Sequence, residues 1–204
     1  MVKSTENFII GMIVPDGFAH VPTFYLAFQV GLYLGKVPRL YISGKGRYGH
    51  WDVGRTDVLE QIQKDYPNER YIKMMWIDSD VIVKEPQGFI ESIKYAYDHN
   101  YNIVGKYHTI QSETIVNCIW RKDSTPYIWS SLSDEDIEAL CKEQNTDYPV
   151  IEGAGLGMFY GTVDLQYKFH QDKQGEDFWF FTDMKQEVRL ATKIELAHWK
   201  QIPL

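Results

Sequence analysis

Apolar and amphipathic segments alternate through the first hundred residues. Short apolar runs bounded by polar residues are typical of strands covered on both faces, and they occupy residues 8–14, 39–43 and 74–77. Apolar side chains recur at helical spacing in residues 21–35, 56–66 and 89–99. This order of strand, helix, strand, helix, strand, helix predicts a parallel, nucleotide-binding type of α/β half.

Two prolines help to delimit the predicted helices. Pro22 suits the first turn of the helix over residues 21–35, where its missing N–H is not needed. Pro67 ends the helix over residues 56–66. The helix over residues 21–35 is apolar around much of its circumference, so we expect it to be well buried.

The second half of the chain changes character. Its patterns predict strands at residues 101–107, 114–120 and 189–199. They predict helices at residues 133–143, 164–169 and 176–185. Ser133 is the predicted N-cap of the first of these helices.

No linker, repeat or low-complexity segment divides the sequence. The expected fold class is therefore α/β, with one domain over residues 1–204 built on a mixed central sheet. Residues 1–105 form its Rossmann-type, nucleotide-binding half, and residues 106–204 form a smaller and more variable half.

Two aspartates flank a serine where the most apolar predicted strand ends. Residues 74–77 are followed directly by Asp78, Ser79 and Asp80. In open α/β sheets, ligands bind in the crevice beyond the carboxyl ends of the strands. If extended geometry persists through Ser79, both carboxylates point to one side, and a cation between them removes their repulsion. The alternative is an ordinary strand end followed by an Asp/Ser turn.

A metal at this position has a candidate set of ligands. Two carboxylates suit Mg²⁺ or Mn²⁺, and an added imidazole shifts the preference toward Mn²⁺. His198, which ends an alternating run near the C-terminus, is the candidate imidazole. A lone histidine is more often a surface residue, and the sequence alone does not place His198 at the strand ends.

Arg55 is a candidate for binding phosphate. It follows Gly54 at the start of the helix predicted just before the aspartate strand. A guanidinium forms a bidentate fork with phosphate, and a helix start adds backbone N–H groups. A solvated surface arginine after a glycine turn fits the same pattern equally well.

Two further segments carry candidate chemistry. Glu176 and Asp177 lie at a predicted helix start, where the helix dipole favours acidic residues even if they have no function. In the functional interpretation, one of them is a general base for a hydroxyl nucleophile. Gly153, Gly155 and Gly157 permit close approach of the backbone to a ligand. They do not form a dinucleotide fingerprint, because the strand-turn-helix context is missing.

Composition narrows the classes of function. The chain has 204 residues, 44% of them hydrophobic and 15% aromatic, which is enough for one well-filled core. The formal net charge of −7 and the lack of a basic stretch disfavour nucleic-acid binding. Residues 21–35 are too short and interrupted to span a bilayer, and no signal peptide is recognisable. With Cys118 and Cys141 read as reduced thiols, we expect a cytoplasmic protein.

Taken together, these segments resemble the glycosyltransferases of the GT-A fold. Four features carry the resemblance, in order along nearly the whole chain. They are the first strand ending in Ile13-Val14-Pro15, the Gly54-Arg55-Thr56-Asp57 helix, the Ile77-Asp78-Ser79-Asp80-Val81 form of the D-x-D motif, and the late Gly175-Glu176-Asp177-Phe178-Trp179 and Ala197-His198-Trp199-Lys200 segments. The D-x-D motif alone is short and unspecific, whereas the ordered set is far more specific. The small size resembles archaeal-virus and phage members of this group, which would place the protein in the host cytoplasm.

The resemblance implies a metal-dependent hexosyltransferase that moves a sugar from a nucleotide-diphosphate sugar to a hydroxyl of a glycan or glycoprotein. It assigns each candidate residue a role. Val14, Pro15 and Asp16 would border the base of the nucleotide, and Arg55 would contact the nucleotide. Asp78 and Asp80 would hold the ribose and a Mn²⁺ or Mg²⁺ ion, with His198 as the third contact to the metal or the diphosphate. Gly153, Gly155 and Gly157 would lie beside the donor sugar and the acceptor, and Asp177 or Glu176 would be the general base if the enzyme inverts. The acceptor half is short for the family, so the expected acceptor pocket is either shallow or completed by a partner.

Three other readings compete with this one. A haloacid-dehalogenase-like phosphatase also carries Asp-x-Asp on a strand, with the first Asp as nucleophile, although there the motif normally lies on the first strand. A nucleotidyltransferase uses a similar fold and metal. A non-catalytic nucleotide-sugar-binding protein would retain the fold without turnover. The donor base, the sugar, the acceptor, the stereochemical outcome and the oligomeric state stay open.

Overall fold

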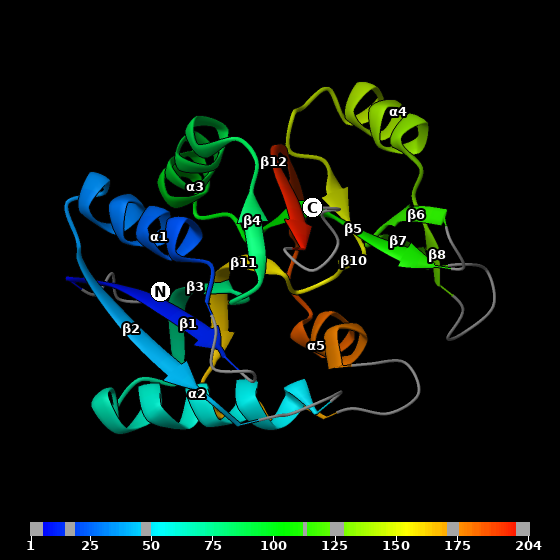
Figure 1. The fold of residues 1–204 in the computed structure, drawn as a ribbon. Coiled ribbons are helices and arrows are strands. Elements are labelled where there is room, and N and C mark those ends of the chain that lie inside the picture. The colour runs from blue at the N-terminus through cyan, green and yellow to red at the C-terminus, as the bar shows by residue number, and fades with distance from the viewer. Residues whose placement is uncertain are drawn as a thin grey trace.

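The computed structural model describes residues 6–14, 19–45, 50–111, 114–122, 129–170 and 176–198. Their main feature is one mixed sheet with helices on both faces (Figure 1). The strand order along its main path is β2-β1-β3-β11-β5-β12-β4. The sheet thus takes strands from both halves of the chain, and the predicted α/β fold class with a mixed central sheet is confirmed.

The first half has the predicted alternation of strands and helices. Strands β1 (Asn7–Ile13), β2 (Val37–Ser43) and β3 (Tyr71–Ile77) are parallel, and β1 lies between the other two. The connecting helices are α1 (Val21–Tyr33), α2 (Trp51–Asp65) and α3 (Pro86–His99). Because the chain leaves β1 toward β2 and later returns to its other side with β3, the strand order reverses at β1. The carboxyl ends of β1 and β3 flank this switch point, where doubly wound sheets bind ligands.

The second half completes the sheet with both strand directions. Strand β11 (Met158–Asp164) is antiparallel to β3 and to β5 (Ile103–Gln111), and β12 (Val188–His198) is parallel to β5. The remaining elements are β4 (Val81–Val83), β6 (Thr114–Asn117), β7 (Ile119–Lys122), β8 (Trp129–Ser131), β9 (Val150–Ile151), β10 (Gly153–Ala154), α4 (Asp134–Gln144) and α5 (Glu176–Met184). Strands β10, β7 and β8 form a separate small sheet.

Local sequence signals account for several of these boundaries. Ser133 caps α4 as predicted: its hydroxyl accepts the N–H of Asp136, whose carboxylate accepts the N–H of Ser133 in return. The predicted strand over residues 114–120 is interrupted at Cys118, which separates β6 from β7. The N–H of Cys118 donates to the carbonyl of Tyr107, and its own carbonyl accepts the N–H of Gly155.

The predicted helix over residues 164–169 is wrong. Asp164 ends β11, and its side chain accepts the N–H of Gln166 while its carbonyl accepts the N–H of Tyr167. Aspartate side chains compete in this way with helical hydrogen bonding and favour a turn. Phe169, beyond the turn, packs into the core.

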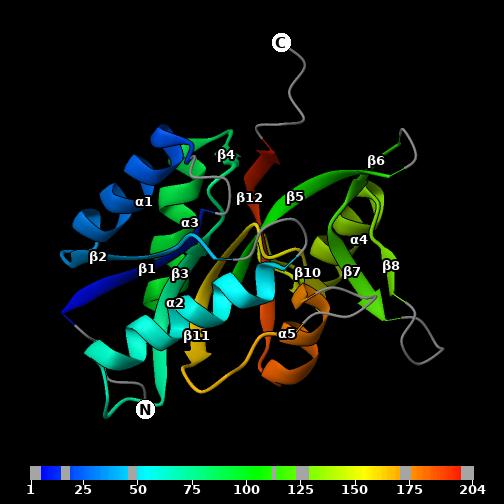
Figure 2. The same ribbon diagram turned by 60° about the horizontal axis from the view of Figure 1, so that its bottom comes forward.

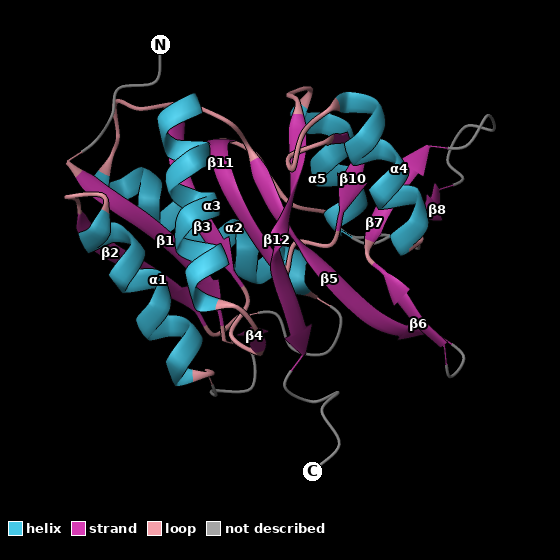
Figure 3. Cartoon of the chain, turned by 90° about the horizontal axis from the view of Figure 1, so that it is seen from above, coloured by secondary structure: helices cyan, strands magenta, loops and turns pink. Residues whose placement is uncertain are grey.

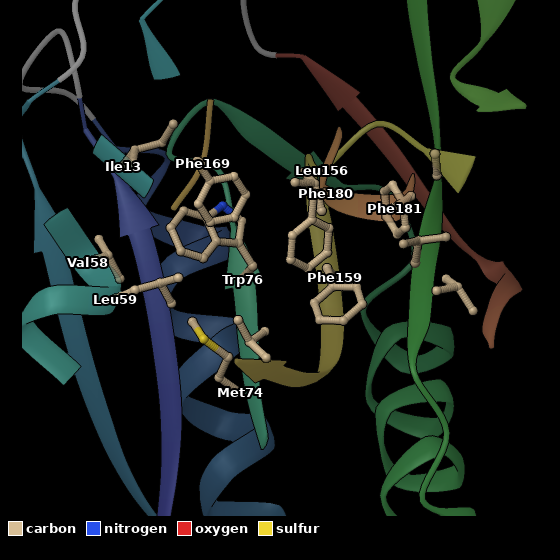
Figure 4. Packing of buried hydrophobic residues seen from close by; sticks show 14 of the residues in the cluster. Ile13, Val58, Leu59, Met74, Trp76, Leu156, Phe159, Phe169, Phe180 and Phe181 are labelled. Atoms are coloured by element: carbon tan, nitrogen blue, oxygen red, sulfur yellow. The ribbon is translucent and has the colours of Figure 1, made fainter. Parts of the chain in front are cut away.

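The core is divided between the two faces of the sheet by the period-two alternation of strand residues. Met74 and Trp76 pack on the face covered by α2 and α5, together with Phe159 (Figure 4). Met75 and Ile77 pack on the opposite face, against α1 and α3. Figure 2 shows α2 and α5 on their common face, and Figure 3 shows α1 and α3 side by side over the other.

Helix α1 is less buried than its sequence predicts. Leu26 and Val30 face the sheet, but the outer side chains Val21 and Tyr25 are 71% and 63% exposed. A helix with apolar side chains around much of its circumference is well buried only if other elements cover its outer side as well as its inner side. Across the described ranges, no helix is long and apolar enough to cross a membrane.

Candidate functional site

Asp78 follows the last residue of β3 at the switch point of the sheet. Its N–H donates to the carbonyl of Gly157, and its carbonyl accepts the N–H of Val81 at 3.3 Å, so residues 78–81 form a turn that leads into β4. Extended geometry therefore does not persist through Ser79, so the two-residue period of a strand no longer predicts that Asp78 and Asp80 point to the same side. The turn brings Asp80 close enough for its negative charge to act on Asp78.

Both oxygens of the Asp78 carboxylate are held by protein groups. The indole N–H of Trp76 donates to Oδ1 at 3.1 Å, and Nη2 of Arg55 donates to Oδ2 at 3.2 Å. Burial raises the pKa of Asp78 above its ordinary value, opposed by Arg55 and reinforced by Asp80. The side chain is 18% exposed, so a ligand at the strand ends can still approach it.

The backbone of His198 lies beside the aspartate turn. His198 ends β12 and is paired in antiparallel register with Val81, the residue after Asp80. The structure thus returns the C-terminal strand to the position that the metal hypothesis requires. The His198 side chain lies outside the described residues.

Arg55 lies in the second turn of α2, because this helix begins at Trp51 rather than at residue 56. The predicted helix start at Arg55 is therefore wrong. Asp52 in the first turn suits the positive end of the helix dipole. Gly54 lets the helix approach the end of β1, since a Cβ there would lie 2.6 Å from the carbonyl oxygen of Lys45 and 2.8 Å from Ile13 Cγ2.

The guanidinium of Arg55 is the centre of a buried charge cluster. Arg55 is 2% exposed, so the reading as a solvated surface arginine is wrong. Besides Asp78, it lies 3.5 Å from Glu176 Oε1 and 3.7 Å from Asp177 Oδ1. Its Cζ is 5.0 Å from the ring centroid of Trp76, a distance typical of a cation–π contact.

Arg55 is charged although it is buried. Burial works to lower its pKa, but the charges of Asp78, Asp177 and Glu176 outweigh this and raise it. One guanidinium balances only one carboxylate, so the cluster keeps an excess of negative charge. Through these contacts Arg55 holds the carboxylates of Asp78, Glu176 and Asp177 close together.

Asp177 lies in the first turn of α5 with its carboxylate fixed at one oxygen. Oδ2 accepts the backbone N–H of Leu156 at 3.1 Å, whereas Oδ1 is buried without a hydrogen-bond donor among the described residues. Burial raises the pKa of Asp177 to about 7, with Arg55 opposing and Glu176 adding to the rise. A carboxylate of this pKa can exchange a proton near neutral pH.

The segment 153–157 connects these acids through its backbone. Leu156 donates its N–H to Asp177 and accepts Nη1 of Arg55 at 3.4 Å, and Gly157 accepts the N–H of Asp78. A Cβ at Gly155 would lie 3.0 Å from Tyr107 Cδ1, and at Gly157 3.4 Å from Tyr107 Cδ2. Close packing against a tyrosine ring accounts for both glycines without a ligand, while Gly153 pairs with Trp120 in the small sheet.

Of the predicted base-binding residues, the structure describes Val14, which directly follows β1. Val14 is half-buried, and its N–H donates to the carbonyl of Ser43 at 2.8 Å. This places Val14 at the carboxyl edge of the sheet, on the same side as Asp78. Pro15 and Asp16 lie outside the described residues.

The side chains of this cluster are of the type that bind a hard divalent cation, but too few of the described ones converge to form a complete metal site. Among the described residues, no group of three His, Cys, Asp or Glu side chains converges as a ready metal site. Asp78 and Asp80 supply carboxylate oxygens of the kind that Mg²⁺ and Mn²⁺ bind. The excess negative charge around Arg55, to which the buried Oδ1 of Asp177 contributes, is what an added cation would offset.

Three groups of the cluster were missed from the sequence. Trp76 lies two residues before Asp78, so the strand period could have identified it as a neighbour on the same side. The backbone of Leu156 gave no such signal, because main-chain groups carry none in the sequence. Phe169 lies beside Trp76 (Figure 4), with its ring centroid 6.0 Å from Arg55 Cζ, and belongs to the segment predicted as a helix.

Comparisons with known proteins give little to set beside this geometry. No protein-family model matches the chain, and no curated protein matches it. Among solved structures, the chain is similar to mannose-1-phosphate geranyltransferase from Thermus thermophilus, with 8% sequence identity and a TM-score of 0.39. That match covers 94% of this chain and 76% of the other. A likeness this distant carries no argument about the site.

Proposed function

We propose that the protein is a metal-dependent glycosyltransferase of the GT-A type that transfers a sugar from a nucleotide-diphosphate sugar to a hydroxyl acceptor. The proposal rests on one observation. Arg55, buried at the carboxyl edge of the sheet, joins Asp78 of the D-x-D motif to Glu176 and Asp177 from a helix nearly a hundred residues later. This proximity supports the proposal, because the transfer would need the motif and a general base close together.

The position of the cluster supports a nucleotide donor. The switch point between β1 and β3 is where doubly wound sheets bind nucleotides. Val14, after β1, lies on one side of this switch point, and Asp78 and Asp80, after β3, lie on the other. In the proposal the base and ribose lie along β1 and the diphosphate lies over the aspartate turn.

A divalent cation at the aspartate turn would neutralise the charge that develops on the departing diphosphate. Asp80 and Asp78 would hold it, with His198 as the third contact. Asp78 would share its carboxylate with Arg55 and Trp76, which fix its orientation in advance. Preoriented ligands reduce the reorganisation needed when charge develops in the transition state.

Asp177 is the proposed base for an inverting transfer. The acceptor hydroxyl oxygen would form its bond to the anomeric carbon as the bond from that carbon to the diphosphate oxygen breaks. The hydroxyl proton would pass to the carboxylate of Asp177, whose side chain is 26% exposed. The Leu156 N–H fixes the orientation of this carboxylate through Oδ2, and a pKa of about 7 suits a base working near neutral pH.

A phosphatase of the haloacid-dehalogenase type receives less support. It would require the first Asp of the motif to attack phosphorus. Both oxygens of Asp78 accept hydrogen bonds from Trp76 and Arg55, which lowers their nucleophilicity. Asp78 also follows the third strand of the chain rather than the first.

Screening nucleotide sugars tests the proposal. Each donor is incubated with the protein and Mn²⁺ or Mg²⁺, and released nucleoside diphosphate is measured with and without a chelator. We expect metal-dependent release from one class of donor. A generic phosphate ester serves as the second substrate, and its hydrolysis without release from any nucleotide sugar would contradict the proposal in favour of a phosphatase.

A further inference from the structure

The solvent side of α1 is a continuous apolar surface. Its exposed residues recur along one side of the helix, and all but Gln29 are apolar or aromatic. They are Val21, Pro22, Tyr25, Gln29, Leu32 and Tyr33. Tyr25, Leu32 and Tyr33 are 63%, 66% and 61% exposed. We name this set the α1 outer face.

The other helices on the sheet do not share this property. The exposed positions of α3, which packs beside α1, include Glu91, Lys94 and Asp98. On α2 they include Glu60 and Lys64. Surface helices normally carry such polar residues toward water. The thirteen residues of α1 include no charged side chain, so its outer face is built differently from its neighbours.

We infer that the α1 outer face is the contact surface of a symmetric dimer, in which α1 of one copy packs antiparallel to α1 of a second copy. By typical side-chain areas the exposed apolar residues present roughly 500 Å², which is at the upper end for a monomer surface patch. A two-fold pair would then bury on the order of 1,000 Å², the lower limit for a specific interface. The dimer is accordingly weak and depends on concentration.

The charge distribution favours a second copy over a lipid surface. Each chain carries a formal net charge of −7, which opposes association. The α1 outer face is uncharged and therefore adds no close contact between like charges when two copies meet there. Antiparallel packing also sets each helix N-terminus beside the C-terminus of its partner, which the helix dipoles favour. Helices that lie on membranes carry Lys or Arg on their polar side, and α1 has neither.

The neighbouring edge strand does not provide the contact instead. β2 is the outer strand of the sheet, but it carries Pro38 and the exposed Arg39. Proline and charged residues on an edge strand prevent pairing with another strand. The interface is therefore between helices rather than a continuation of the sheet.

Sedimentation equilibrium of the full chain over a range of concentrations tests the dimer. We expect the average mass of the wild type to rise from one chain toward two as concentration increases. Leu32→Glu and, separately, Tyr25→Glu place a charge in the α1 outer face and should keep the protein monomeric. Val53→Glu is the matched control, because Val53 is a 47% exposed apolar residue on α2, across the sheet; it should dimerise like the wild type.

Two results would overturn the inference. One is a wild type that stays monomeric at every concentration. The other is a dimer that persists in both α1 variants, with circular dichroism confirming that each is folded. Flotation with neutral and anionic lipid vesicles completes the test, since binding of a monomeric wild type that Leu32→Glu abolishes would assign the face to lipid and contradict the dimer.

Discussion

Arg55 determines how the acids of the candidate site are arranged. Its guanidinium contacts Asp78, Glu176 and Asp177 and stacks over Trp76, with almost no exposure to water. Each acid alone would be costly to bury in ionised form. The arginine offsets part of this cost and also fixes the distances between the acids.

Arg55→Met should therefore destabilise the protein strongly. Removing one partner of a buried ionic cluster leaves the other charges uncompensated, which typically costs about 3–5 kcal/mol. The loss should be smaller at pH 5 than at pH 8, because protonation of the raised-pKa acids relieves their repulsion. Urea unfolding at both pH values measures the effect.

Arg70→Met is the matched control for that experiment. Arg70 also pairs with a carboxylate, Asp164, and also lies over an aromatic ring, Tyr71, but its side chain is 60% exposed. Exposed ion pairs contribute little to stability. The unfolding midpoint should hardly move; equal losses in the two variants would contradict the role given to Arg55.

Asp177→Asn should change stability in a pH-dependent way. Because the native pKa is raised to about 7, the folded protein holds a proton between about pH 4 and pH 7 that the unfolded chain has lost. The wild type therefore loses stability as pH rises through this window, whereas the neutral amide does not. Relative to wild type, the free energy of unfolding of the variant should increase by about 2 to 3 kcal/mol between pH 5 and pH 8, because each pH unit below the native pKa contributes about 1.4 kcal/mol.

The same variant separates binding from transfer. Donor binding should be retained, because Asp177 does not belong to the aspartate turn, while transfer to the acceptor should be lost. Thermal unfolding from pH 5 to pH 8 and an assay of transfer give both readouts. A stability difference that is constant across this range, or retained transfer, would show that Asp177 is not the buried base.

At the residue scale the sequence predicted the identities of the acids better than their surroundings. Asp78, Asp80 and Asp177 were identified from strand ends and helix starts, which are local signals. The burial of Arg55 could not be read locally, since Gly54 and Arg55 equally fit an exposed turn. Only the packing of α2 against β1 and α5 decides between the two readings.

At the scale of elements, the close approach of α2 to the sheet brings Arg55 to the acids. This approach requires a glycine at position 54, where no side chain fits between the helix and Lys45 or Ile13. The helix also begins five residues before the start that its apolar spacing predicts, and Arg55 lies on its buried side.

Gly54→Ala should move α2 outward. Overpacking of this kind costs about 1–3 kcal/mol, only partly offset by the higher helix propensity of alanine. Gly44→Ala is the control, because the nearest atom to a Cβ there is the Val14 carbonyl oxygen at 3.9 Å. Urea unfolding of both variants checks the prediction, and an unchanged Gly54→Ala midpoint would contradict it.

Elements with strong local signals were predicted well, and those that depend on tertiary pairing were not. The predicted alternation in the first half, the α4 cap and the α5 and β12 segments agree with the structure. β4 and β11 were missed: β4 has only three residues, and β11 directly follows a glycine-rich run. The turn at Asp164 replaced a predicted helix because a side-chain hydrogen bond competed with it.

At the scale of the whole molecule, the mixed sheet collects distant segments at one edge. The end of β1, the turn after β3, the segment before β11 and the end of β12 meet there, and α2 and α5 add Arg55 and Asp177. Sequence order alone gives no distance between such segments. The ordered set of motifs predicted their common role, and the sheet topology supplies the proximity.

The central claim is that the aspartate turn binds a diphosphate through a divalent cation. Isothermal titration of nucleoside diphosphates into the wild type, with Mn²⁺ and with a chelator, measures this most directly. Asp80→Asn removes one proposed ligand, and Asp98→Asn, on an exposed residue of α3 that pairs with Lys94, serves as the control. We predict binding that requires Mn²⁺, persists in Asp98→Asn and is lost in Asp80→Asn; equal affinity in the chelator, or unchanged affinity in Asp80→Asn, would contradict the claim.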